Sequence, residues 1–122
     1  MSLSDNIQFH IDALMAAQGE EIEVLPDLTP TTVTMVPMSV RREQGEEEGL
    51  MLSADRLDFL VEIKNYPESE PAYDHKFRRT IGQKVYHYVA AGDSSSEPVY
   101  EPFDKVGLAW RIHTVLREIT DA

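Results

Sequence analysis

Two carboxylates and a lysine stand close together in the stretch Asp58-x-x-x-Glu62-Ile63-Lys64, and a further carboxylate, Asp55, precedes them. Carboxylate oxygens are ligands that Mg²⁺ accepts, and a bound Mg²⁺ beside a lysine could position a water for cleavage of a phosphodiester bond. These four residues are therefore the strongest candidates in the chain for catalysis.

The element that must position them reads as a strand over 57–64. Its side chains alternate, so that Asp58, Glu62 and Lys64 lie on one face. The commonest meaning of such a pattern is a strand whose charged face lies in solvent and whose apolar face packs on a core. The apolar face carries Leu57, Phe59, Val61 and Ile63.

The order Asp, Glu-x-Lys resembles the core of restriction-type nucleases. In that family the aspartate comes from a preceding strand, whereas Asp58 and Glu62 share one strand with only three residues between them. Such a nuclease would also need helices over its sheet, and residues 79–91 fit a helical stripe as well as a hairpin. We therefore expect no enzyme, and the alternative is a small metal-dependent nuclease centred on Glu62 and Lys64.

No other group of residues forms a recognisable catalytic or ligand site. The chain has no cysteine, the glycines are too far apart to cradle a phosphate, and the histidines lack the short spacing of a metal site. We expect no metal and no cofactor. His113 shares a strand face with Arg111, which favours a hydrogen-bonding or interface role. The remaining histidines are His10, His75 and His87.

Length and charge narrow the class of protein. The 122 residues fit a single domain, 1–122, and no run of about eighteen apolar residues occurs that could cross a bilayer. The net charge of -11 comes from 22 acidic and 11 basic residues, and a surface of that sign repels phosphate backbones. The N-terminus does not look like a secretory signal, so we expect synthesis in the cytoplasm.

One helix is expected, over about 4–18. Its apolar side chains recur at helical spacing, Ser4 is a candidate N-cap, and Gly19 is the expected terminator. The apolar stripe should lie on a sheet or on a neighbouring subunit. It consists of Ile7, Ile11, Leu14 and Met15.

The rest of the chain, about 20–117, reads as a β-rich body. We predict a mainly β fold, α+β by count: a small antiparallel β-barrel or sandwich of about six to seven strands with one N-terminal helix. Trp110 alternates with Leu108 and Ile112, so we expect it inside. Predicted strands cover 20–25, 31–34, 57–64 and 108–115, and 77–81 and 84–90 form a hairpin through Gly82-Gln83.

Three polar segments should be long exposed loops: 43–49, 67–74 and 92–98. A polar excursion of this length buries too little apolar surface to fix its own conformation, so a partner is expected to order it. The candidate assembly contacts are Glu46, Glu47, Glu48, Ser94, Ser95, Ser96, Arg111 and His113.

Three stretches of the C-terminal half together form a longer pattern. They read Phe77-x-x-Thr80-Ile81-Gly82-x-x-Val85-Tyr86-x-Tyr88-Val89, Pro98-x-Tyr100-x-x-x-Asp104-x-x-Gly107 and Trp110-Arg111-Ile112-His113-Thr114. With them the chain resembles the head-tail joining proteins of tailed bacteriophages, a group that includes head-closure, stopper and connector proteins. In that group a hairpin is followed by a loop, an Asp-x-x-Gly turn and a last strand.

The resemblance implies a structural component of the virion that joins the portal side of the head to the tail. It implies a ring of copies whose loops become ordered on docking, with portal or adaptor proteins and tail proteins as partners. DNA would pass through the channel without specific binding, and no membrane would be involved. A second alternative, which no motif favours, is an unassigned β-barrel binding module.

Overall fold

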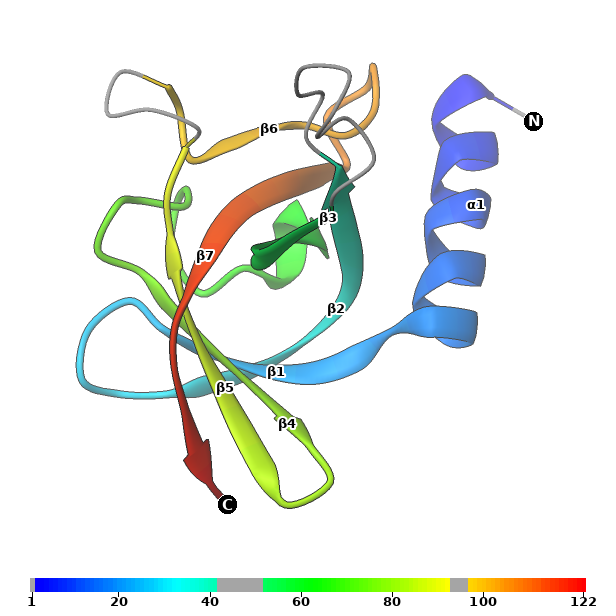
Figure 1. The fold of residues 1–122 in the computed structure, drawn as a ribbon. Helices are drawn as coiled ribbons and strands as arrows, with labels where there is room; N and C mark the ends of the chain where they lie inside the picture. The colour runs from blue at the N-terminus through cyan, green and yellow to red at the C-terminus, as the bar shows by residue number, and fades with distance from the viewer. Residues whose placement is uncertain (1, 42–51, 93–96) are drawn as a thin grey trace, which may run out of the picture.

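The computed structural model describes residues 2–41, 52–92 and 97–122 (Figure 1). The predicted loop 43–49 lies outside the described residues, as does most of the predicted loop 92–98. Two sets of candidate assembly contacts therefore cannot be placed: Glu46, Glu47 and Glu48, and Ser94, Ser95 and Ser96.

The helix α1 spans Leu3–Gln18, and its N-cap is Ser2 instead of the predicted Ser4. The Ser2 hydroxyl accepts a hydrogen bond from the backbone N–H of Asp5 at 3.1 Å, and the Asp5 carboxylate accepts one from the backbone N–H of Ser2. This reciprocal pair satisfies two donors that a helix start leaves open, and Ser2 alone stands at the spacing it requires. Among the described residues, no helix has the length and hydropathy of a membrane span.

Gly19 ends the helix as predicted, and its backbone N–H donates to the carbonyl of Met15. The chain then turns directly into the first strand. A Cβ added at Gly19 would lie 2.4 Å from the Met15 carbonyl oxygen and 2.7 Å from a methyl group of Thr34. Because real Cβ atoms do not approach so closely, only glycine lets the helix end this near to the sheet.

Gly19→Ala is therefore expected to lower the free energy of unfolding by about 1–3 kcal/mol, since backbone atoms must move to admit the methyl group. Urea denaturation measures the change. Gln18→Ala, one residue earlier on an exposed position, is the matched control and should shift stability by less than about 0.5 kcal/mol. Equal effects of the two variants would show that the close approach at Gly19 does not matter.

The seven strands form one antiparallel sheet that closes on itself. Its hydrogen-bonded order is β3-β2-β1-β4-β5-β7, and β3 also pairs with β7, so six strands make a barrel to which β6 adds beside β7 (Figure 1). The predicted mainly β fold is confirmed. Of the two architectures that the sequence left open, barrel and sandwich, the structure has the barrel. The strands are β1 Glu20–Leu25, β2 Thr31–Arg41, β3 Leu52–Glu62, β4 Lys76–Ile81, β5 Lys84–Ala90, β6 Tyr100–Pro102 and β7 Ala109–Asp121; a 3₁₀ turn, η1, spans Ile63–Asn65.

Strands β4 and β5 form the predicted hairpin. Ile81 pairs with Lys84 across the two-residue connection Gly82-Gln83, and Gly82 has φ +61, the left-handed conformation that such tight turns require. The helical interpretation of 79–91 is wrong. These residues form two strands, and Tyr88 faces the barrel interior from β5. The helical spacing of the apolar residues is therefore a coincidence.

The barrel interior holds the main core, and aromatic rings fill its centre. The ring centroid of Phe59 lies 5.7 Å from that of Phe77 in a stacked arrangement and 5.6 Å from that of Tyr88 in an edge-on arrangement. Trp110 is half-buried at the margin of this core, against Tyr66 and Tyr100, which is less enclosed than expected.

A second, smaller core lies outside the barrel, under α1. Ile11 of the helix packs against Val36 of β2, Leu60 of β3 and Ala109 of β7. The stripe of Ile7, Ile11, Leu14 and Met15 thus lies on the sheet, as predicted. The outer face of β3 is consequently covered in part by α1. This contradicts the prediction that the charged face of this strand lies in solvent.

Asp58 and Glu62 were expected on a solvated face, but only 3% of Asp58 and 8% of Glu62 remain exposed. Lys64 is exposed as expected. Two neighbours account for the burial: α1 reaches Glu62 through Gln8, and side chains of β7 cover Asp58. The alternation is as predicted from Leu57 to Glu62, but β3 ends there, and Ile63 and Lys64 belong to η1 instead of the strand. The side of β3 opposite the core is not open to water.

Candidate functional site

The four residues of the nuclease alternative are divided among three places instead of meeting in one cavity. The Glu62 carboxylate accepts a hydrogen bond from Gln8 at 3.0 Å and lies 3.5 Å from the Lys64 ammonium. Asp58 bonds to residues of β7, and Asp55 is exposed at the start of β3. In the part of the chain that the structure describes, no three acidic or histidine side chains group as ligands for a metal ion. The geometry that cleavage would need is therefore not formed.

Asp58 instead forms the centre of a charged cluster with Arg111 and His113. The Arg111 Nε donates to Asp58 Oδ2, and the His113 Nδ1 lies 3.0 Å from Asp58 Oδ1. An ionised carboxylate only accepts hydrogen bonds, so the Nδ1–H of His113 is the donor. These three residues, named here the Asp58 cluster, join β3 to β7 on the outer face of the barrel.

The strand register brings the Asp58 cluster together. Asp58 pairs directly with His113, and Arg111 pairs with Leu60 two positions along the same face. Residues that share a face on neighbouring antiparallel strands lie within side-chain reach. Sequence reasoning singled out all three members but did not connect them, because the pairing of β3 with β7 spans about fifty residues of chain.

Charge and burial oppose each other in this cluster. Burial by itself would raise the pKa of Asp58, but the hydrogen bonds and positive charges of His113 and Arg111 hold it below its usual value. The hydrogen bond to Asp58 and its negative charge raise the pKa of His113 against the effect of burial. The cluster therefore favours an ionised Asp58 beside a protonated His113.

The Asp58 cluster borders a cleft of about 290 Å³ between β3, β7 and the chain that leads into β6. Positive and negative side chains are balanced around it, and the guanidinium of Arg56 donates to the carbonyl of Ala91 at 3.0 Å. A balanced lining suits ion pairs within the fold or with a docked polar side chain better than it suits a phosphate. The lining residues are Arg56, Asp58, Glu97, Pro98, Glu101, Arg111 and His113.

The Asp-x-x-Gly motif proves to be a turn that introduces β7. The Asp104 carboxylate accepts hydrogen bonds from the backbone N–H groups of Val106, Leu108 and Ala109, and Gly107 has φ +80. Burial works to raise the pKa of Asp104, but these backbone donors lower it overall. The motif thus fixes the start of β7, the strand that brings Arg111 and His113 to Asp58 on the outer face of the barrel.

A closed barrel, a covering helix and polar clusters that tie strand to strand define a small structural β-barrel domain. A family model described as phage head-tail joining protein matches residues 1–121. The chain therefore belongs to the phage head-tail joining family, whose members are structural components of the phage particle. Comparisons with curated proteins and with solved structures find no match.

Proposed function

We propose that this protein joins the portal side of the phage head to the tail as a ring of identical copies. The observation that supports this role most strongly is the family match, which extends over residues 1–121 rather than over one motif. The neighbours in the particle would be portal or adaptor proteins on one side and tail proteins on the other. The chain would be made in the bacterial cytoplasm and end in the virion.

Assembly would proceed through the polar loops. We expect the loops 43–49 and 92–98 to take up defined positions only against neighbours, with Glu46, Glu47, Glu48, Ser94, Ser95 and Ser96 among the contacts. Arg111 and His113 are further candidates, since both remain partly accessible beside the cleft at Asp58. Because these loops would become ordered only on docking, the ring would form only where a portal or adaptor protein is present to dock against.

DNA would pass through the ring without specific binding. The net charge of -11 supports this part of the proposal, because a predominantly acidic wall repels the phosphate backbone and does not retain it.

The test is to inactivate the coding sequence in a phage that carries it. Filled heads and free tails should then accumulate separately, and supply of the protein from a plasmid should restore joined particles. Electron microscopy of joined particles should show density for a ring at the head-tail junction. Normal yields of joined particles without the protein would refute the proposal.

A further inference from the structure

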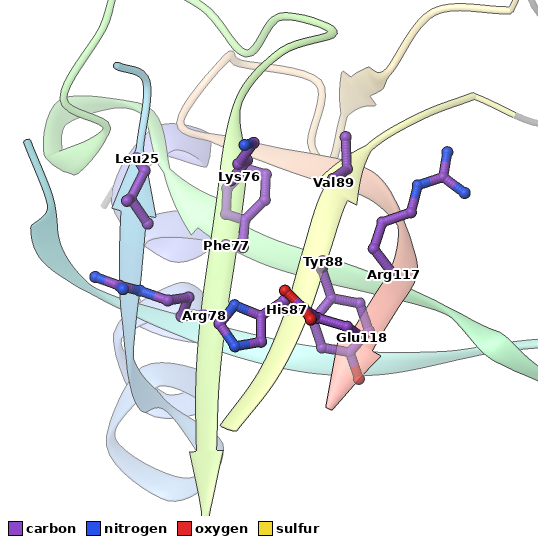
Figure 2. Close-up of a pocket in the computed structure, with 9 residues that line it drawn as sticks. All are labelled: Leu25, Lys76, Phe77, Arg78, His87, Tyr88, Val89, Arg117 and Glu118. Atoms are coloured by element: carbon purple, nitrogen blue, oxygen red, sulfur yellow. The ribbon is translucent and has the colours of Figure 1, made fainter. Parts of the chain in front are cut away.

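A groove of about 330 Å³ crosses the outside of the barrel on the side of β4 and β5 (Figure 2). Its walls come from β1, β4, β5 and β7, and it is separate from the cleft at Asp58. The groove is lined by Leu25, Lys76, Phe77, Arg78, His87, Tyr88, Val89, Arg117 and Glu118.

The charge of this groove is opposite to that of the protein. Lys76, Arg78 and Arg117 belong to its lining, against Glu118 as the carboxylate. Within the described part of the chain, Lys76 and Arg117 make no side-chain ion pair or hydrogen bond, and Arg78 shares a carboxylate with Glu23 at 3.2 Å. Among the described residues, a protein of net charge -11 thus holds two cations without a bonded carboxylate in one groove, with Glu118 as the acidic residue of the lining.

A β-bulge places Arg117 at the groove. His87 pairs with Glu118 while the next residue, Tyr88, pairs with Leu116, so Arg117 is the extra residue on β7. Such a bulge re-aims a side chain that a regular ladder would hold elsewhere. Figure 2 shows Arg78 on one side of the groove and Arg117 on the other, with His87 and Glu118 between them. The Nε of Arg78 is also buried without a hydrogen-bond partner among the described residues.

The acidic counterpart in the sequence is Glu46-Glu47-Glu48, which lies in the connection between β2 and β3. In the closed order of six strands, β3 stands three strands from β4, and β2 stands three strands from β5. The two strands that this connection joins, β2 and β3, therefore lie across the barrel from β5 and β4, whose residues form the middle of the groove.

We infer that the groove receives Glu46-Glu47-Glu48 of a second copy, and this inference rests on the ring assembly proposed above. Contacts between two different surfaces of identical subunits run head to tail, and they form a ring when the rotation from copy to copy closes. Carboxylates bind the forked guanidinium of arginine with two hydrogen bonds, which gives the contact both orientation and affinity. Each exposed pair contributes little alone, but a closed ring repeats the contact at every junction.

Engineered disulfides test this pairing directly, because the chain has no native cysteine. In the double variant Glu47→Cys with Val89→Cys, an added oxidant should link residue 47 of one copy to residue 89 of the next. The expected result, for protein in purified joined particles, is a ladder of covalent oligomers on a non-reducing gel. Glu47→Cys with Phe9→Cys is the matched control, since Phe9 is exposed on α1 on the far side of the barrel, and it should give no ladder.

Charge reversal supplies the second measurement. Lys76→Glu with Arg117→Glu should reduce the yield of crosslinked oligomer severalfold, whereas Glu118→Gln removes a like charge and should increase it. Adding Glu46→Lys and Glu48→Lys to the groove variant should restore the ladder, a rescue that mere damage to folding would not allow.

The two proposals fail in different ways. Joined particles that contain a ring but yield no ladder, or equal ladders from the variant and its control, would overturn the groove contact and leave the joining function intact. Normal joining in the absence of the protein would overturn the function itself.

Discussion

Phe59→Ala is expected to lower the free energy of unfolding by about 3–5 kcal/mol. Phe59 is fully buried, and it contacts both Phe77 and Tyr88 in the centre of the barrel. Its removal loses transfer free energy and leaves a cavity lined by rigid aromatic rings that cannot collapse to fill it. A loss of this size is a large part of the total stability of a domain this small.

Urea denaturation followed by tryptophan fluorescence measures the change, since the one tryptophan, Trp110, lies at the margin of the same core. Phe9→Ala is the matched control: Phe9 is 68% exposed on α1, and its removal should change stability by less than about 0.5 kcal/mol. If the two variants lost stability equally, the assignment of the barrel interior as the main core would be wrong.

The strands of this barrel could be predicted because local alternation is strong in most of them. In β1, Ile22 and Val24 face the core between glutamates, and the β4–β5 hairpin is marked by glycine at its turn. The ends of several strands and one whole strand were not predicted. Strand β3 spans Leu52–Glu62 where 57–64 was expected, and β7 runs to Asp121 where 108–115 was expected. The prediction for β2 stopped at 34, before Pro37 interrupts the pattern, although the strand runs to Arg41. The short β6 was not predicted at all, since three residues ending in Pro102 carry no periodicity.

Barrel closure and burial on the outer face could not be predicted in the same way. Both depend on the pairing of β3 with β7 and on the position of α1, which are contacts between distant parts of the chain. The simple reading of Asp58 and Glu62 as solvated charges failed for this reason. A strand pattern tells which side chains share a face, but only the tertiary structure tells what covers that face.

The register also shows where the candidate catalytic residues of the nuclease alternative lie. A nuclease of this type needs Asp58, Glu62 and Lys64 around one metal ion, and the sequence already departed from that family because Asp58 and Glu62 share one strand. The register instead gives Asp58 two cationic partners from β7, while Glu62 turns to Gln8 and Lys64. The charge of the Asp58 carboxylate is thus balanced by Arg111, a side chain of the same fold, where a nuclease would have a metal ion.

Asp58→Ala is the second variant with a large expected effect, a loss of about 3 kcal/mol in the free energy of unfolding near pH 6. The change removes the buried carboxylate between Arg111 and His113. His113 then keeps only the more exposed Glu101, 4.0 Å from its Nε2, as an acidic neighbour. Both retain some access to water, with 29% and 23% of their side chains exposed, so the loss should stay at the low end for a broken buried ion pair. Asp12→Ala, an exposed aspartate on α1, is the matched control.

The pH dependence of stability distinguishes the Asp58 cluster from a merely structural contact. The pKa of His113 is raised in the folded state, so its contribution is fully present below the unfolded value of about 6.5 and is lost as pH rises through the folded value. The pKa of Asp58 is lowered, so its contribution is present above about 3.9 and is lost as pH falls through the folded value. The cluster should therefore stabilise the fold most between about pH 4 and about pH 6.5.

Denaturation curves of the wild type and of Asp58→Asn, recorded from about pH 5 to about pH 9, test this window. The wild type should lose stability with rising pH through the titration of His113, and the asparagine variant should lose much of that slope, because a neutral amide no longer favours the protonated ring. His10→Gln, which removes an exposed histidine, should keep the wild-type slope. Because the Arg111–Asp58 pair stays charged across the range, part of the difference in stability between wild type and Asp58→Asn must persist at the alkaline end. Parallel curves for wild type and Asp58→Asn would mean that His113 titrates independently of Asp58, and the cluster would then reduce to the arginine pair alone.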